Sequence, residues 1–266
     1  MRRRSLLVLL CALGAAPALG IPAAAAPQAS PPAVDPQKAP LTVDEVVSRM
    51  EQRNHEREQA LRKFVGTRVY TLKYTGFFGT HEAAMTVSLN YSAPSDKEFT
   101  IVSESGTKFI VDHVLKGLLQ GEKEAALPEN QQKTALTRKN YDFAIAGFDA
   151  SQNPPQYILT VTPKRDYKFL YRGKIWVDAK DFAVTHIEAE PAKSPSFWVK
   201  KSEVNHRYEK VDQFWLPAEN KTDSLIRLGG HAVLSIEYQS YKITDAGTPA
   251  AADAPSAGAA GSKPSL

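Results

Sequence analysis

The feature that most constrains this fold is a long series of segments in which apolar and polar residues alternate. In residues 82–91, Met85, Val87 and Leu89 share one face of an extended strand, and Thr86 and Ser88 face the other way. A period of two is typical of a β-strand that is buried on one face only. The same reasoning predicts ten strands, at residues 64–75, 82–91, 98–104, 141–149, 156–163, 168–178, 182–190, 197–211, 214–227 and 231–243.

Turn-forming residues separate the predicted strands by short connections. Asn153-Pro-Pro, Asp178-Ala-Lys-Asp and Gly229-Gly are examples. Short connections join antiparallel neighbours, because a parallel pair needs a long crossover. Ten strands in succession with few helices therefore predict a mainly β fold of the α+β class. We expect an unclosed antiparallel β-barrel, or one strongly curved sheet, with a helical lid.

Two segments break the period of two and predict helices. The first begins at Thr42 and carries Asp44 and Glu45 in its first turn, where acidic side chains suit the helix dipole. The second spans residues 108–124, where apolar residues recur at helical spacing on a wide stripe. This helix must bury its stripe on the sheet, yet it can close only part of a concave face. Either side chains fill the interior or an apolar cavity remains, and the pattern leaves both open.

The N-terminal residues predict an export signal. Arg2, Arg3 and Arg4 precede a short apolar run and then Ala- and Pro-rich sequence. The run is too short to span a bilayer, which takes about 20 residues. Residues 1–26 are therefore assigned to a cleaved signal, of the general secretory or the twin-arginine type. Cys11, the single cysteine, does not follow a small residue, so lipidation is not expected and the mature chain has no thiol.

The rest of the chain divides into three parts. Residues 27–40 read as a flexible leader, residues 41–244 as one domain, and residues 245–266 as a disordered low-complexity tail. The chain has 33 Lys and Arg residues against 29 Asp and Glu residues. Because the predicted signal holds three of the arginines and no acid, the mature chain has a formal charge of +1. Nucleic-acid binding, which needs clustered basic residues, is not expected.

The sequence shows no constellation typical of catalysis. It lacks a Gly-x-Ser-x-Gly elbow, a His-Glu-x-x-His pair and a phosphate-binding glycine loop, and its six histidines are scattered. Tyr238 and Lys242 resemble a reductase pair, but four residues along a strand span about 13 Å. Glu188 and Glu190 alternate with apolar residues, as on a solvated strand face. The sequence therefore predicts no catalytic residue, no metal site and no cofactor.

The rows of large apolar residues on several segments are the candidate ligand-binding residues. They come from three predicted strands and from the predicted helix at 108–124. If a cavity remains under that helix, these side chains line it. The residues are Met85, Val87, Leu89, Val111, Val114, Leu115, Leu118, Tyr157, Leu159, Val161, Leu234, Ile236 and Tyr238.

Four stretches carry a resemblance to a known family. They are Tyr171–Pro191, Pro195–Trp198, Phe214-Trp-Leu-Pro217 and Ile236–Tyr241. Together they resemble the outer-membrane lipoprotein-sorting proteins of the LolA-like superfamily, over about residues 42–244. The resemblance implies an unclosed antiparallel barrel with a helical lid over an apolar cavity. It also implies a periplasmic location and binding of lipoprotein acyl chains or another lipid.

The chain departs from that family at two places. The family's best-known carriers have an Arg-Pro after the second strand, which clasps the lid, whereas this chain reads Tyr91-Ser-Ala-Pro-Ser-Asp-Lys97. The helix at 108–124 also replaces a strand-rich segment. From the resemblance we therefore expect the family's fold and apolar cavity in this chain. We do not transfer the clasp or the lipoprotein cargo to it.

The leading functional hypothesis is a periplasmic carrier for lipoprotein acyl chains or another lipid, involved in envelope lipoprotein sorting. Its partners would be the lipid itself and transport components of the inner or outer membrane. The alternative is an envelope-stress sensor or protein-interaction module of the same fold with a filled core. A third hypothesis is a hydrolase whose site the motifs do not reveal.

Overall fold

The computed structural model of the chain describes residues 39–77, 79–194, 196–227 and 229–248. The predicted signal, most of the predicted leader and residues 249–266 of the predicted tail lie outside the described residues. Within the described ranges, no helix is both long enough and apolar enough to cross a membrane.

The described residues form one antiparallel sheet of ten strands, in the order β3-β2-β1-β10-β9-β8-β7-β6-β5-β4. In the part of the chain that is described, no pairing joins the two edge strands β3 and β4, so the sheet does not close. The predicted mainly β, unclosed antiparallel fold is confirmed. The strands are β1 (Leu61–Gly76), β2 (Gly79–Ser92), β3 (Asp96–Gly106), β4 (Tyr141–Asp149), β5 (Gln156–Pro163), β6 (Tyr171–Asp178), β7 (Val184–Pro191), β8 (Val199–Val211), β9 (Phe214–Ile226) and β10 (Gly230–Ala246).

Strand ends differ from the predicted ends where the backbone turns. The predicted strand at 168–178 begins only at Tyr171, because Leu170 N–H donates to the Tyr167 carbonyl in a turn. The predicted strand at 182–190 begins only at Val184, because Phe182 has φ 51°. At the other end of the chain β10 runs to Ala246, two residues beyond the predicted domain boundary. Ala246 pairs there with Leu61 at the start of β1.

Helix α1 (Val43–Ala60) begins where the sequence predicts. Thr42 Oγ1 accepts from Glu45 N–H at 3.3 Å, and the Glu45 carboxylate accepts from Thr42 N–H at 2.8 Å. This capping box satisfies two backbone donors at the helix start. The helix buries Val46, Val47 and Met50 completely against the inner face of β5–β7.

The predicted helix at 108–124 is confirmed, with an interruption that the sequence did not indicate. It consists of α2 (Lys108–Ile110), a π-helical turn η2 (Val111–Leu115) and α3 (Lys116–Ala125). We call this continuous segment the α2–α3 helix. A further short helix, α4 (Pro128–Thr134), was not predicted, because its mostly polar residues show no apolar period.

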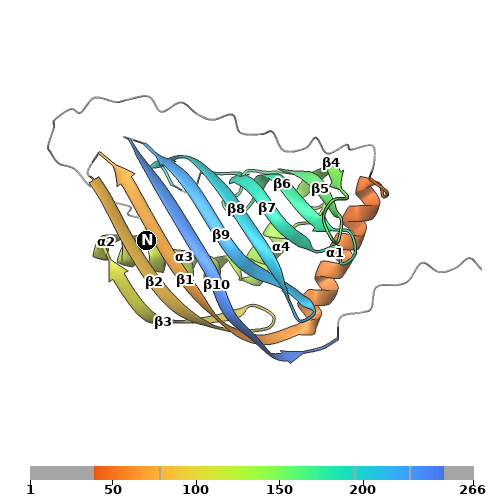
Figure 1. The fold of residues 1–266 in the computed structure, drawn as a ribbon, viewed down its shortest axis with the longest axis horizontal. Coiled ribbons are helices and arrows are strands. Elements are labelled where there is room, and N and C mark those ends of the chain that lie inside the picture. The colour runs from red at the N-terminus through yellow and green to blue at the C-terminus, as the bar shows by residue number, and fades with distance from the viewer. Residues whose placement is uncertain (1–38, 78, 195, 228, 249–266) are drawn as a thin grey trace, which may run out of the picture.

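The interior holds two main apolar cores, one under each long helix, and a third, smaller core around Ala60, Phe214 and Leu216. One core gathers α1 with the inner residues of β4–β7, including Leu159 and Ile175. The other gathers the α2–α3 helix with β1 and β2, including Met85 and Leu115. Figure 1 shows α1 at the β4–β7 end of the sheet and the α2–α3 helix behind β1–β3. The central strands β8–β10 therefore lie between two covered ends.

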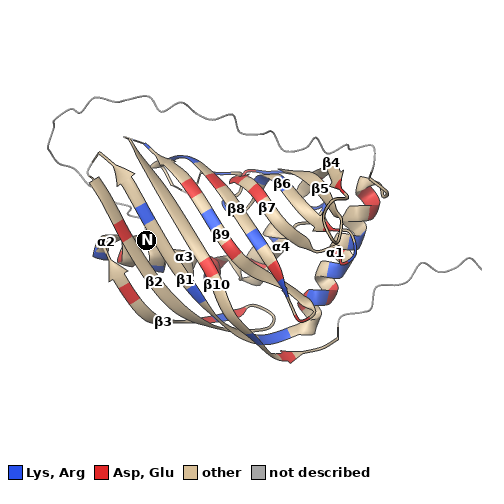
Figure 2. Cartoon of the chain, in the orientation of Figure 1, with Lys and Arg blue, Asp and Glu red and all other residues tan. Residues whose placement is uncertain are grey.

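The opposite, outer face of the sheet is solvated and carries both charge signs. Figure 2 shows acidic and basic residues interspersed along β8, β9 and β10. Lys201 Nζ lies 3.1 Å from Glu190 Oε1, and Lys73 Nζ lies 2.8 Å from Glu82 Oε1. Exposed pairs of this kind contribute little to stability. Glu190 thus belongs to a solvated charged face, as the sequence predicts.

Candidate functional site

The candidate site is the inner face of the central strands, between the two apolar cores. Strand register aligns its residues in rows: Tyr70 on β1 pairs with Ile236, Ile236 with Asn220, Asn220 with His206, and His206 with Ile187 on β7. Each such row joins one core to the other. We define the central strip by its eight half-buried residues, which are Val204, His206, Tyr208, Asn220, Thr222, Leu234, Ile236 and Tyr238.

A row of stacked rings and one guanidinium crosses the strip. The Arg68 guanidinium carbon lies 5.5 Å from the centre of the Phe99 ring and 4.9 Å from that of Tyr238. Tyr238 in turn lies nearly parallel to His206 at 6.1 Å, and His206 to Tyr208 at 4.5 Å. Flat groups in this arrangement form a continuous, largely apolar floor.

Arg68 ties the sheet to the α2–α3 helix. Its Nη1 lies 2.5 Å from Glu122 Oε2, and Lys97 Nζ on β3 lies 2.7 Å from Glu122 Oε1. Burial raises the pKa of Glu122, but the charges of Lys97 and Arg68 outweigh this effect, so that its pKa lies below the usual range. Burial alone would lower the pKa of Arg68, but the charge and hydrogen bond of Glu122 have the larger effect. The pKa of Arg68 is therefore raised. Both groups are therefore charged at neutral pH.

His206 is neutral in the folded protein. Burial, followed by the nearby Arg68 charge, lowers its pKa to about 4. Its Nδ1 lies 3.3 Å from Asn220 Nδ2, an amide nitrogen that can only donate. The ring proton is thus on Nε2, which is buried and has no hydrogen-bond partner among the described residues. Arg68 Nε is likewise buried without a partner there.

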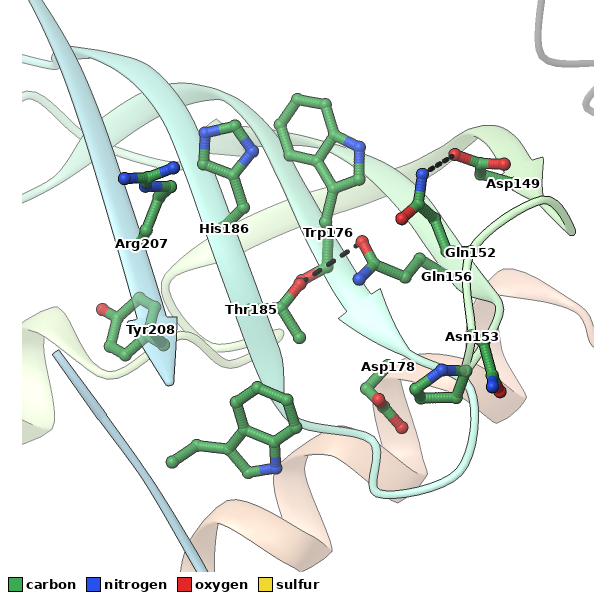
Figure 3. A pocket seen from close by; sticks show the side chains of 12 residues that line it. Asp149, Gln152, Asn153, Gln156, Trp176, Asp178, Thr185, His186, Arg207 and Tyr208 are labelled. Atoms are coloured by element: carbon green, nitrogen blue, oxygen red, sulfur yellow. Dashed lines mark hydrogen bonds between the residues drawn. The ribbon is translucent and has the colours of Figure 1, made fainter. Parts of the chain in front are cut away.

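An open cleft of about 440 Å³ lies beside β6–β8, and Tyr208 of the central strip forms part of its wall (Figure 3). Trp176 and His186 stack at 4.5 Å and point to one side of the sheet, whereas Thr185 and Tyr208 point to the other. Amide and carboxylate groups, such as Gln152 bonded to Asp149 Oδ2 at 3.2 Å, line much of its wall. Pro154, Trp176 and Trp215 contribute apolar surface to the same wall.

A second, smaller cleft of about 220 Å³ lies at the edge between β7 and β8, near Pro191 and Lys201. Neither cleft is lined by any of the thirteen residues that the sequence predicts for the ligand site.

The structure divides those thirteen residues between the two cores and the strip. Tyr157, Leu159 and Val161 lie in the core under α1, apart from the rest. Eight of the thirteen are fully buried in side-chain packing, namely Met85, Val87, Leu89, Val111, Leu115, Tyr157, Leu159 and Val161. The other five are half-buried and lie at the strip or beside it, namely Val114, Leu118, Leu234, Ile236 and Tyr238.

Sequence reasoning missed the polar members of the site. Arg68 occupies an inward position of β1, between Gly66 and Tyr70, where the alternation calls for an apolar residue. This charged residue at an inward position could have identified Arg68 as a site residue from the sequence. Lys97 comes from the segment in which the family's clasping arginine is lacking. Glu122 and His206 carry no such signal, because a helix surface and a histidine-containing strand are ordinary.

In the described part of the chain, no group of three or more His, Cys, Asp and Glu residues is placed to hold a metal ion. Tyr238 and Lys242 both lie in β10, as the sequence predicts, so they do not share one turn of a helix.

The chain is similar to one protein family and to several solved structures. A family of unknown function, DUF5686, matches residues 134–242. No curated protein matches the chain. Similar solved structures include a DUF1329 family protein from Desulfovibrio piger, with 12% identity and a TM-score of 0.38 over 76% of this chain and 93% of that one.

Two further similar structures carry the name of the superfamily or of its activity. An outer membrane lipoprotein-sorting protein domain from Vibrio parahaemolyticus has 7% identity and a TM-score of 0.37, over 76% of this chain and 93% of that one. A LolA superfamily protein from Nitrosomonas europaea has 9% identity and a TM-score of 0.33, over 77% of this chain and 94% of that one.

Proposed function

We propose that this chain is a periplasmic binding protein that holds a lipid acyl chain on the central strip, with the α2–α3 helix beside the strip as a lid. The observation that carries the proposal is that the two main apolar cores of one continuous sheet, one under each long helix, are separated by a half-buried strip. A domain of this size ordinarily has one continuous core. An apolar occupant between the cores would complete it.

The side chains of the strip suit such an occupant. Leu234, Ile236 and Val204 offer aliphatic surface, and the stacked rings of Tyr208 and Tyr238 add the aromatic surface that their neighbours leave uncovered. Burial of one methylene group contributes about 0.8 kcal/mol. One acyl chain therefore supplies several kcal/mol without a specific polar contact. The predicted export signal, and the resemblance of the sequence to lipoprotein-sorting proteins, support a periplasmic lipid or lipoprotein cargo.

A bulky residue on the strip tests this proposal. We expect a fluorescent fatty-acyl probe to bind the full chain saturably, with an affinity that rises with chain length. Ile236→Trp should abolish that binding by filling the strip. Ser235→Trp, whose side chain leaves the opposite face of β10, should leave the binding unchanged. If wild-type protein shows no saturable binding at any chain length, the proposal fails.

A second candidate function is a protein-interaction module with a filled core. The complete burial of eight of the thirteen predicted residues favours it. It predicts that no lipid accompanies the protein when it is isolated from the periplasm. Native mass spectrometry of that material separates the two functions, because a bound lipid adds its own mass.

A further inference from the structure

Glu122 occupies a position at which two cations of the sheet converge. Arg68 approaches it from β1 at 2.5 Å and Lys97 from β3 at 2.7 Å. In the described part of the chain, no other carboxylate lies within ion-pair distance of either cation. Lys123 adds a further positive charge, 5.7 Å from the Phe99 ring over which Arg68 also lies. Positive charge therefore exceeds negative charge at this end of the strip.

Arg68 is too deeply buried to be left without an anion. The residue is only 5% exposed. A guanidinium in such surroundings is strongly unfavourable unless a negative group pairs with it. When the α2–α3 helix lifts to admit an occupant, Glu122 moves away with it. Another anion must then take the place of Glu122, or water must enter.

Glu122 accepts from only some of the N–H donors of the Arg68 guanidinium. It contacts Nη1, whereas the buried Nε–H has no partner in the described residues. A guanidinium binds carboxylate and phosphate most strongly through two parallel N–H groups. An anion that is free to orient itself can use Nε together with a terminal nitrogen. The geometry is therefore better suited to a mobile oxyanion than to the tethered carboxylate of Glu122.

The position of this cation pair matches the end of the central strip. Arg68 pairs in register with Tyr238, whose ring begins the stacked floor that leads to His206. Lys97 lies on the edge strand β3 and is 24% exposed, so that the pair is reachable from the sheet edge. A chain lying on the strip would thus place its polar head at Arg68 and Lys97.

We propose that Arg68 and Lys97 form a binding site for the oxyanion head, a carboxylate or a phosphate, of the amphiphile whose chain lies on the strip. Glu122 holds this site in the lipid-free protein and is exchanged for the head group when the ligand binds. The inference rests on the proposed function and adds the class of ligand. Exchange of one anion for another releases the α2–α3 helix without leaving Arg68 unpaired.

Three amphiphiles with the same chain and different heads test the site. Hexadecanoate, hexadecyl phosphate and hexadecanol are used below their aggregation limits to displace the fluorescent acyl probe from the full chain. We expect at least one anion to bind about tenfold more tightly than the alcohol. A preference for only one of the two anions identifies the head as carboxylate or phosphate.

Variants then locate that preference. Lys97→Met should remove most of it, and Glu122→Gln should raise the ratio of anion affinity to alcohol affinity several-fold by removing the competing carboxylate. Lys73→Met is the matched control, since it removes one positive charge from the outer face of β1. It should leave the preference intact.

The outcomes separate this inference from the proposed function. If all three amphiphiles bind alike in wild-type protein, the anion site is wrong and the acyl-binding function stands. If the preference survives in Lys97→Met, or if Lys73→Met loses it equally, the head is not bound at this pair. If none of the three binds, the proposed function itself fails.

Discussion

Arg68 on β1 and Glu122 on α3 form an ion pair of 2.5 Å that joins the sheet to the α2–α3 helix across 54 residues of chain. Arg68 is buried and Glu122 is largely so. One carboxylate therefore holds the helix on β1 and β2, together with the apolar contacts of Leu115 and Leu119. The helix position depends on this charge as well as on apolar packing.

Loss of that carboxylate should loosen the α2–α3 helix. In Glu122→Gln the amide cannot balance Arg68 and Lys97, so we expect amide hydrogen exchange to accelerate in residues 108–125 and to stay unchanged in α1. Glu124→Gln is the control on the same helix, because Glu124 pairs with Lys168 at an exposed position. Equal acceleration in both variants would show that the effect is not specific to the buried pair.

The same pair makes stability depend on pH in the acid range. The pKa of Glu122 in the folded protein lies below its ordinary value of 4.5. Its contribution is therefore complete above pH 4.5 and is lost as the pH falls through the lower, folded value. We expect the difference in melting temperature between wild type and Glu122→Gln to be constant from pH 5 to 7 and to shrink in more acidic buffers. A difference that persists unchanged at acid pH would contradict this.

His206 should make the protein more stable as the pH rises from about 4 to its ordinary pKa of 6.5. In this window the unfolded chain binds a proton at His206 and the folded chain does not, so stability increases with pH. The effect is at most about 3 kcal/mol. Urea unfolding at several pH values measures it, and His206→Gln should flatten the profile. His113→Gln, at an exposed position of η2, should not.

A charge on the inner face of β2 should damage the fold, whereas the same charge on the outer face should not. Val87 is completely buried in the core under the α2–α3 helix, and Ser88 faces the other way. We expect Val87→Asp to cost about 3 kcal/mol or more, because a carboxylate there has no partner. Ser88→Asp should cost less than about 1 kcal/mol. Thermal unfolding compares the two, and similar losses would refute the assigned faces.

Gly106 should be required at the junction between β3 and the α2–α3 helix. Its φ is +87°, and a Cβ there would lie 2.7 Å from Ala83 Cα and still closer to the Glu82 carbonyl oxygen. That oxygen accepts from Thr107 N–H, which directs the chain into the helix. Gly106→Ala should therefore destabilise by about 1–3 kcal/mol.

Gly117 provides the contrast within the same segment. It lies in α3, and a Cβ there would meet no atom within 4 Å. Gly117→Ala should thus stabilise by up to about 1 kcal/mol, since alanine favours the helix. If both alanine variants change the unfolding free energy alike, the backbone of Gly106 is not the constraint that we describe.

Much of the fold follows from local pattern alone. The period of two identified all ten strands, and it assigned Met85, Val87 and Leu89 to one buried face, because alternate side chains of a strand always share a face. Helical spacing likewise identified α1 and the α2–α3 helix. These features depend on neighbours in sequence, so no knowledge of distant contacts was needed.

The site depended on contacts that the pattern cannot reveal. Periodicity placed Tyr157 and Leu234 in one predicted cavity, but the structure separates them, because α1 and the α2–α3 helix cover opposite ends of the sheet. The sequence alone determined which residues face inward, since that is a property of each strand. Only the tertiary structure decided which helix covers which strands and brought Arg68 to Glu122, since register and sheet curvature bring together residues far apart in the chain.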